Sequence, residues 1–489
     1  MSFSVTPIGI ILIMGFIALL YKDFFREKHL AVANGASFVF KDCLKKFYID
    51  NFICFVCLTF LTNLGYIVKV NSFEVGLFTP FYTIIWVLSL YFLIAEKKFD
   101  KKIIIVGSII AVIDIIAVVL CVVFPYKNGI ITENRLWDLY LAGEDVKTYS
   151  FSFGSIHIKY LFTLFKFTIT LATVNYIIKD EDIWFKLLEI IVKMSYFVVA
   201  YGFIEMIALK LFNFSTTNSI INFLFSVKPV TDYVSQGRFQ GLYKEPSHYC
   251  LNLFFISLFV ILYLIKNKNT MQVKNGILIG VLLALVLLLM ALSKAFSAVI
   301  LIPLSVFVFV WYFFSSKQKL SLILAIIVLT ALIFSLIMNK TVATAIGFES
   351  LNEKINGVFD SIGKILSGRE AAFSSEGSRF TSMFESVKLL FYRPWGVGLG
   401  NTDAHSSFFS LFACLGIVGA PLHIYIILRS GHFSQKSLIF GFVILISILF
   451  IGGIGYFTSI VYPVLFFMGY LIFPEPKVKK KKVELYEKE

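Results

Sequence analysis

The chain has 489 residues, of which 58% are hydrophobic and 15% are charged, and its formal net charge is +14. Soluble domains are close to half apolar and a quarter charged, so this composition excludes a soluble globular protein. Lysines and arginines cluster beside the ends of apolar runs, where they act as orientation signals, so we expect no nucleic acid partner.

Apolar runs recur along the chain, and most are long enough to cross the hydrocarbon core of a bilayer. They are too long and continuous for the strands of a closed barrel, which leaves helices as the spanning elements. The sequence therefore predicts an all-α fold, a polytopic transmembrane helix bundle of about 12–14 spans. The expected spans are residues 4–21, 51–69, 75–95, 103–124, 156–178, 185–213, 247–265, 275–292, 295–315, 319–338, 405–428, 437–454 and 456–473.

Basic residues between the spans predict the orientation of the bundle. They mark alternate loops as cytoplasmic, beginning with the loop after the first span, which puts the N-terminus outside. Residues 29–40 are too few to cross and are expected at the membrane interface. The chain then divides into a transmembrane bundle at 1–338 with outer loops near 125–155 and 214–246, a large outer loop at 339–404, C-terminal spans at 405–473 and a basic cytoplasmic tail at 474–489.

The first motif lies where the chain re-enters the membrane after the loop at 214–246. It is a twelve-residue stretch, G-R-F-Q-G-L-Y-K-E-P-S-H, in which glycines and a proline fix a bend around charged side chains. Its polar members are Arg238, Tyr243, Lys244, Glu245 and His248. An ordinary interfacial loop with snorkelling lysine and arginine is the alternative reading. A second, shorter motif is the outer turn Ser293-Lys294, where the lysine either snorkels or donates to a phosphate.

The large outer loop contains two helical patterns and then a bend. An apolar stripe predicts a helix that lies on the membrane surface or caps the bundle, with the residues Ile346, Leu351, Ile355, Val358, Phe359, Ile362 and Leu366. A second amphipathic helix begins at Arg379 and ends before Pro394. Its C-terminal neighbour Arg393 precedes glycines at 396, 398 and 400, and then Asp403 and His405 stand at the mouth of the next span. This glycine run resembles a phosphate loop only weakly, because no strand precedes it and no Gly-Lys-Ser/Thr follows.

Asp114, Lys166 and Glu205 fall inside expected spans, each about two to three turns below the outer surface. Charges at that depth face the interior of a bundle and find partners. We expect Lys166 to pair with Asp114 or with Glu205, and we favour a structural pair over a proton path.

Four basic side chains share the outer side of the membrane in this topology: Arg238, Lys294, Arg379 and Arg393. They suit an anionic lipid head group, and the planar fork of arginine binds phosphate through two hydrogen bonds. A lipid-linked diphosphate is the natural ligand, because such a leaving group needs charge stabilisation more than a general acid. One base would then deprotonate an attacking hydroxyl, and His405 and Glu245 are the two candidates.

Three motifs together resemble the O-antigen polymerase and ligase superfamily of bacterial inner membranes. They are R-x-x-G-x-x-x-E-P from Arg238 to Pro246, the Ser-[Arg/Lys] turn at Ser293-Lys294, and R…P-x-G-x-G-x…H-S at Arg379, Pro394, Gly396, Gly398 and His405. The resemblance implies a GT-C-like, metal-independent glycosyltransferase without a cofactor, whose active site and large loops face the periplasm. An O-antigen polymerase joins undecaprenyl-diphosphate-linked oligosaccharide repeats, one as donor and one as acceptor, in a membrane that also holds a flippase and a chain-length regulator.

On this resemblance we assign Arg238 and Arg379 to the diphosphate, with Arg393 and Lys294 in support. His405 or Glu245 is the base, and Lys244, His248, Tyr243 and Asp403 are supporting side chains.

Other functions remain open at this point. Ligases of the same superfamily often have His-[Asn/Asp] in place of His405-Ser406 and Asn-Pro-Asn in place of Glu245-Pro246-Ser247, and both differences favour a polymerase. A flippase for lipid-linked sugars would have short loops and charges spread along many spans. A structural scaffold for export would tolerate substitution of the arginines.

Overall fold

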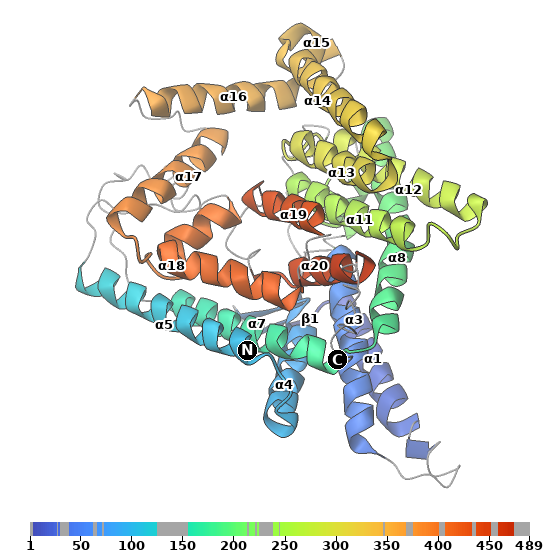
Figure 1. Ribbon diagram of the computed structural model, residues 1–489, viewed down its shortest axis with the longest axis vertical. Helices are drawn as coiled ribbons and strands as arrows, with labels where there is room; N and C mark the ends of the chain where they lie inside the picture. The colour runs from blue at the N-terminus through green and yellow to red at the C-terminus, as the bar shows by residue number, and fades with distance from the viewer. Residues whose placement is uncertain are drawn as a thin grey trace, which may run out of the picture.

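The computed structural model describes residues 3–26, 28–29, 39–61, 66–70, 73–124, 155–212, 215–220, 223, 238–243, 245–345, 348–367, 375–400, 406–432, 437–450 and 458–473. These ranges are mainly helical (Figure 1). The helices are α1 (Pro7–Leu20), η1 (Tyr21–Arg26, a π-helix), α3 (Phe40–Leu61), α4 (Thr79–Glu96), α5 (Lys101–Val123), α7 (Ser155–Ile177), α8 (Glu181–Phe212), α9 (Thr216–Ile220), α11 (Pro246–Lys266), α12 (Val273–Leu292), α13 (Ala298–Phe313), α14 (Ser316–Met338), α15 (Lys340–Ala345), α16 (Glu349–Leu366), α17 (Ser375–Tyr392), α18 (Ser407–Ser430), α19 (Leu438–Phe450) and α20 (Val461–Ile472).

A multi-pass helical membrane protein follows from these elements. Within the described ranges nine helices are long and apolar enough to cross a membrane: α1 with η1, α4, α5, α7, α8, α11, α12, α14 and α18. Three shorter apolar helices, α13, α19 and α20, fall on predicted spans. The tail at 474–489 and most of the outer loops at 125–155 and 214–246 lie outside the described residues.

The second predicted span, 51–69, is displaced in the structure. Its helix, α3, begins at Phe40 and ends at Leu61, because the charged turns before residue 51 continue the helix. The β-branched run Tyr66–Val70 forms strand β2 instead of the end of a span, as its residue types favour. It pairs with β1 (Phe3–Val5) and β3 (Phe73–Gly76) in a small antiparallel sheet of order β1-β2-β3, in which Phe3 lies opposite Val70 and Val70 opposite Phe73. Residues 30–38, most of the segment expected at the interface, lie outside the described residues.

Two groups of helices build the bundle. In one group α5 lies against α7 and α18, with α4 against α7, and in the other α11 lies against α8, α12 and α13 (Figure 1). Helix α20 contacts both α11 and α18, and α3 contacts both α4 and α8, so these two helices join the groups. Helix α11 is apolar on all sides, and its residues from Tyr249 to Leu262 are all buried, which makes it the central helix of the second group.

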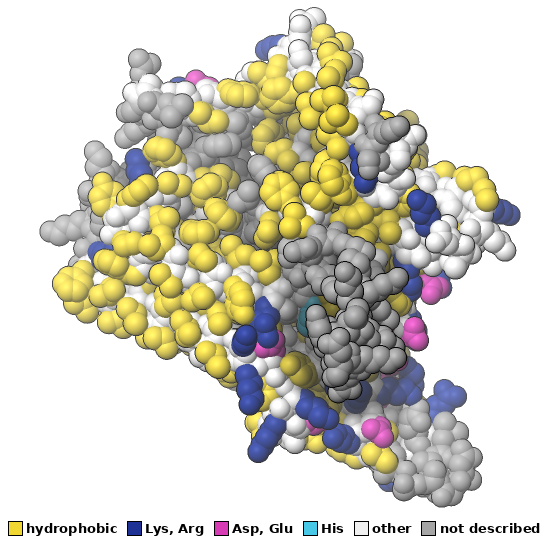
Figure 2. Space-filling view, viewed as in Figure 1, with side chains coloured by type: hydrophobic (Ala, Val, Ile, Leu, Met, Phe, Trp, Pro, Cys, Tyr) yellow, Lys and Arg dark blue, Asp and Glu magenta, His cyan; other side chains and the backbone are white. Residues whose placement is uncertain are grey.

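Charged residues that the sequence assigns to the cytoplasmic side contact one another. Lys22 Nζ lies 2.6 Å from Asp50 Oδ2, Lys41 Nζ lies 2.9 Å from Glu96 Oε1, and Arg429 Nε lies 2.8 Å from Asp100 Oδ2. Figure 2 shows many of the lysine and arginine side chains along the lower and right edges of the molecule. We call this side the lysine face, and the side with the opposite helix ends the loop face.

Helices α15 and α16 lie at the end of α14, with α15 at the top and α16 at the upper left in Figure 1, and α17 follows below α16 on the left. Leu351 and Ile355 of α16 are buried against Ile337 of α14. The amide of Asn352 donates to the carbonyls of Ile337 (2.7 Å) and Met338 (3.0 Å), which closes the C-terminal end of α14. The predicted apolar stripe from Leu351 to Leu366 thus belongs to a helix that packs on a span end, whereas Ile346 lies outside the described residues.

Candidate functional site

Residues 238–243 form a tight segment that is packed into the loop face. Gly241 has φ +55°, and a Cβ there would lie 2.5 Å from the ring of Tyr249 in α11. The hydroxyl of Tyr249 donates to the Val198 carbonyl of α8 at 3.3 Å, and a Cβ on Gly202 of the same helix would collide with it. Glycines at both positions therefore let one tyrosine join the segment to α8 and α11.

A second tyrosine of this segment fixes it to α3. The Tyr243 hydroxyl donates to the Thr59 carbonyl at 3.1 Å, and beside it the Asn252 amide donates to the Phe60 carbonyl at 3.0 Å. Both bonds satisfy carbonyls in the last turn of α3, which have no partner inside that helix. The predicted supporting residue Tyr243 is thus a positioning residue that is 4% exposed.

Glu245 is the N-cap residue of α11, with extended backbone angles, and Pro246 occupies the first helical position. The Glu245 side chain makes no capping hydrogen bond to the backbone. Its Oε2 instead accepts from the Ser247 hydroxyl at 3.2 Å. His248 is half-buried in the first turn of the same helix. The α11 N-terminus therefore keeps its partial positive charge directed at the loop face.

Lys294 lies in the turn between α12 and α13, on the same side. Its backbone is left-handed, with φ 52°, and the buried Ser293 hydroxyl stabilises the turn by donating to the Met290 carbonyl at 2.7 Å. The pKa of Lys294 is lowered from 10.5, first because burial disfavours its charge, and then because Lys210 and Arg238 repel it. The three cations therefore share one region.

Arg238 and Lys294, which are 56 positions apart in sequence, are thus close enough for the charge of Arg238 to act on Lys294. Arg238 is 6% exposed. Lys210, in the last turn of α8, is a member that sequence reasoning missed. One sequence feature could have identified it: Lys210 is a basic residue at the loop-face end of a long apolar helix. We call Lys210, Arg238 and Lys294 the cation cluster.

Glu205 lies one turn before Lys210 and is 1% exposed. The Ser215 hydroxyl donates to its Oε1 at 2.8 Å, and the Thr216 hydroxyl donates to its Oε2. The carboxylate therefore holds the start of α9 against the end of α8. Lys166 is not its partner: that ammonium lies over the rings of Tyr82 and Phe162, 5.3 Å and 5.1 Å from their centroids.

The glycine bend, residues 394–400, docks into a kink of α18. Gly416 interrupts that helix with φ 69° and ψ −172°. Carbonyls freed by the kink accept from the bend: Ala413 from Val397 N–H at 3.0 Å and Cys414 from Gly398 N–H at 2.9 Å. In return, Ile417 N–H donates to the Pro394 carbonyl at 2.8 Å. The glycine run is therefore a packing device rather than an open phosphate loop.

Leu399 anchors the bend to α5 and α7. Its N–H donates to Asp114 Oδ1 at 2.6 Å, and its carbonyl lies 2.8 Å from His157 Nδ1. Asp114 and His157 are both buried. The expected pairing of Lys166 with Asp114 is therefore wrong, because a backbone amide meets this carboxylate and aromatic rings meet the lysine.

Arg393 is engaged at the end of α5, where its Nη2 donates to the Phe124 carbonyl. Its guanidinium also lies 5.8 Å from the centroid of the Trp395 ring. A cation at the C-terminal end of a helix is favourable for the helix dipole. The described contacts thus place Arg393 at the C-terminal end of α5.

The structure does not describe the side chains of the remaining predicted site residues. Lys244, Asp403 and His405 lie outside the described residues. Arg379 belongs to the first turns of α17, but its side chain is not described. The sequence matches no protein-family model, and comparisons with curated proteins and with solved structures gave no match.

Proposed function

We propose that the protein is a polysaccharide polymerase of the O-antigen type, a membrane glycosyltransferase that acts on lipid-diphosphate-linked oligosaccharide repeats. The cation cluster carries the proposal, because three positive side chains from distant parts of the sequence share one region of the loop face, which suits an anionic ligand. Their position at the loop-face ends of apolar helices, beside the N-terminus of α11, is where a lipid diphosphate would sit. The motif resemblance gives the sugar chemistry.

The reaction transfers the growing chain from its lipid carrier to a new repeat. A hydroxyl at the non-reducing end of the new unit attacks the anomeric carbon of the donor, and the bond from that carbon to the diphosphate oxygen breaks. The hydroxyl proton passes to the base, and the lipid diphosphate leaves with the electron pair of the broken bond. Arg238, Lys294 and Lys210 would stabilise the charge that develops on this leaving group.

The assignment of the base stays between two residues. Glu245 stands at the start of α11 with its carboxylate in contact with Ser247, seven positions after Arg238 in sequence. His405 is the alternative from the motif resemblance, and Arg379 with Asp403 would approach with it. Lys244 and His248 flank Glu245 and would contact the diphosphate or the acceptor.

Polysaccharide length in cells tests the proposal. The test uses cells of the source organism that lack the chromosomal gene and express one variant each: Arg238→Ala, Lys294→Ala or Lys210→Ala. The length of the polysaccharide chains is then read from the polysaccharide ladder. Each lost charge-assisted contact is worth about 1.5–3 kcal/mol, so we expect transfer to fall roughly tenfold to a hundredfold. Lys193→Ala is the control, because Lys193 is also on α8 but pairs with the exposed Glu189 at 2.7 Å.

The product that accumulates separates the alternatives. A lost polymerase leaves single-repeat products outside the membrane, whereas a lost flippase leaves repeat units inside it. A lost ligase leaves long chains on the lipid carrier. Long chains from both Arg238→Ala and Lys294→Ala, at wild-type protein level, would refute the proposed function.

A further inference from the structure

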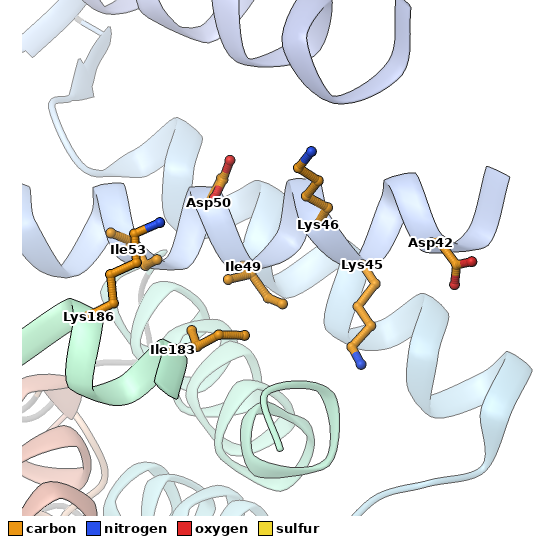
Figure 3. Close-up of a pocket in the computed structure, with 8 residues that line it drawn as sticks. All are labelled: Asp42, Lys45, Lys46, Ile49, Asp50, Ile53, Ile183 and Lys186. Atoms are coloured by element: carbon orange, nitrogen blue, oxygen red, sulfur yellow. The ribbon is translucent and has the colours of Figure 1, made fainter. Parts of the chain in front are cut away.

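We infer that the lysine face carries a binding site for the phosphate head group of an anionic phospholipid, in a pocket between α3 and α8. This site lies at the opposite helix ends from the cation cluster, so the inference does not depend on the proposed function. The pocket encloses about 310 Å³. Its lining is Asp42, Lys45, Lys46, Ile49, Asp50 and Ile53 from α3 with Ile183 and Lys186 from α8 (Figure 3).

Lysine is in excess in this pocket. Three lysines and two aspartates line it, and Lys22 takes up one aspartate, with its Nζ 2.6 Å from Asp50 Oδ2. Neither Lys45 nor Lys186 forms an ion pair with a residue in the described ranges, and both are exposed. The pocket therefore has an exposed lysine on each of its two helices, and the two lysines stand toward opposite ends of it in Figure 3.

The pocket is also apolar on one side. Ile49 and Ile183 face each other across it in Figure 3, and Ile53 lies one turn further along α3, toward the C-terminal end of that helix. The lysines and isoleucines that line one pocket match the two parts of an anionic phospholipid, its phosphate head group and its acyl chains. Basic pockets between helices on the cytoplasmic side bind such lipids by this combination. A soluble anion would gain nothing from the isoleucines, which is why we commit to a lipid.

Aromatic packing beside the pocket fixes its width. Phe52 of α3 and Trp184 of α8 are both buried and meet edge to face, with ring centroids 5.7 Å apart. Trp184 Nε1 also donates to the Ile178 carbonyl at 3.1 Å, and its ring packs on Phe467 of α20 at 4.7 Å. The two helices are thus held apart at a set distance, so the pocket exists before a lipid enters.

Thermal unfolding of the full-length protein in detergent tests the site. Phosphatidylglycerol, phosphatidylcholine and inorganic phosphate would each be titrated, and bound lipid counted by native mass spectrometry. We expect phosphatidylglycerol alone to raise the unfolding temperature and to remain bound. The double variant Lys45→Gln/Lys186→Gln should bind phosphatidylglycerol about tenfold more weakly or worse, because each lysine contributes to binding near an anionic head group.

Matched variants decide between this site and a general surface charge. Lys101→Gln/Lys102→Gln removes the same charge from two exposed lysines of the same face and should keep wild-type affinity. Lys45→Arg/Lys186→Arg keeps the charge and should bind, which also guards against a folding defect in the glutamine variant. Equal loss in the Lys101/Lys102 variant would overturn the inference. So would an equal response to phosphatidylcholine, or one to inorganic phosphate, which would indicate a soluble anion.

Discussion

Asp114 and Leu399 are joined by a hydrogen bond that connects the middle of α5 to the glycine bend 285 positions later, with the Leu399 N–H 2.6 Å from Asp114 Oδ1. Leu399 and Asp114 are both buried. The bond therefore fixes the position of the chain at Leu399, shortly before residues 401–405 in sequence, which include the proposed site residues Asp403 and His405. Stability and site position are coupled at this point.

Replacing Asp114 tests that coupling. Asp114→Leu leaves the Leu399 N–H buried without an acceptor, so the free energy of unfolding should fall by about 1–3 kcal/mol. Asp114→Asn should lose less, because its amide oxygen can still accept. Denaturant unfolding in detergent measures both.

A double-mutant cycle with Lys166→Met serves as the control for this prediction. Because Lys166 lies over aromatic rings and not beside Asp114, the coupling energy between the two positions should stay below about 0.5 kcal/mol. A coupling well above that value would show that the two charges do meet.

The close packing of the glycine bend against α18 predicts that Gly396 cannot be replaced by a residue with a side chain. At Gly396, with φ +87°, a Cβ would stand 2.2 Å from the Cys414 carbonyl oxygen, so Gly396→Ala must displace backbone. We expect a loss of more than about 3 kcal/mol in unfolding free energy, or no folded protein at all. Gly280→Ala in α12 is the control, since nothing lies within 4 Å of its Cβ position, and it should gain about 0.5–1 kcal/mol. Size-exclusion profiles and unfolding curves of both variants are the measurement, and a stable Gly396→Ala protein would contradict this close packing.

Much of the architecture could be predicted from local patterns. Apolar runs of span length fall on helices, and basic residues mark one set of ends, because both signals are contained in stretches of about twenty residues. The boundary of α3 was the exception. Its first turns carry Asp42, Lys45 and Lys46, which look like a loop in a hydropathy profile but remain helical at the edge of the bundle.

The candidate site could be predicted only in part, for a related reason. Arg238 and Lys294 stand in recognisable motifs, whereas Lys210 is an isolated lysine whose role depends on where α8 ends in space. The same holds for His157 and Leu399, 242 positions apart, whose contact no periodicity encodes. Local sequence identifies which segments carry polar groups, and only tertiary packing decides which of those groups meet.

Lys294 should illustrate a conflict between stability and function. Lys294→Gly removes both the left-handed strain of a side chain at φ 52° and the repulsion from Lys210 and Arg238, so unfolding free energy should rise by about 1 kcal/mol or more. The same variant should lose polysaccharide polymerisation. Lys97→Gly is the matched control: Lys97 has φ 53° on the lysine face, so its replacement should relieve strain and leave polymerisation intact. If Lys294→Gly is less stable than wild type, the cations do not repel one another as inferred.

The pH profile of transfer should separate lysine from arginine at position 294. Burial, Lys210 and Arg238 hold the pKa of Lys294 below 10.5, so its proton is lost at a lower pH than that of an exposed lysine, and the cluster then binds a diphosphate less well. Transfer by reconstituted wild-type protein should therefore decline as the pH rises through this lowered pKa. Between this lowered pKa and 10.5, Lys294 is protonated in the unfolded chain but deprotonated in the folded protein. The free energy of unfolding should therefore rise with pH over that interval. Lys294→Arg stays charged throughout and should keep transferring at the higher pH without that gain in stability. Identical declines in the two proteins would mean that another group titrates.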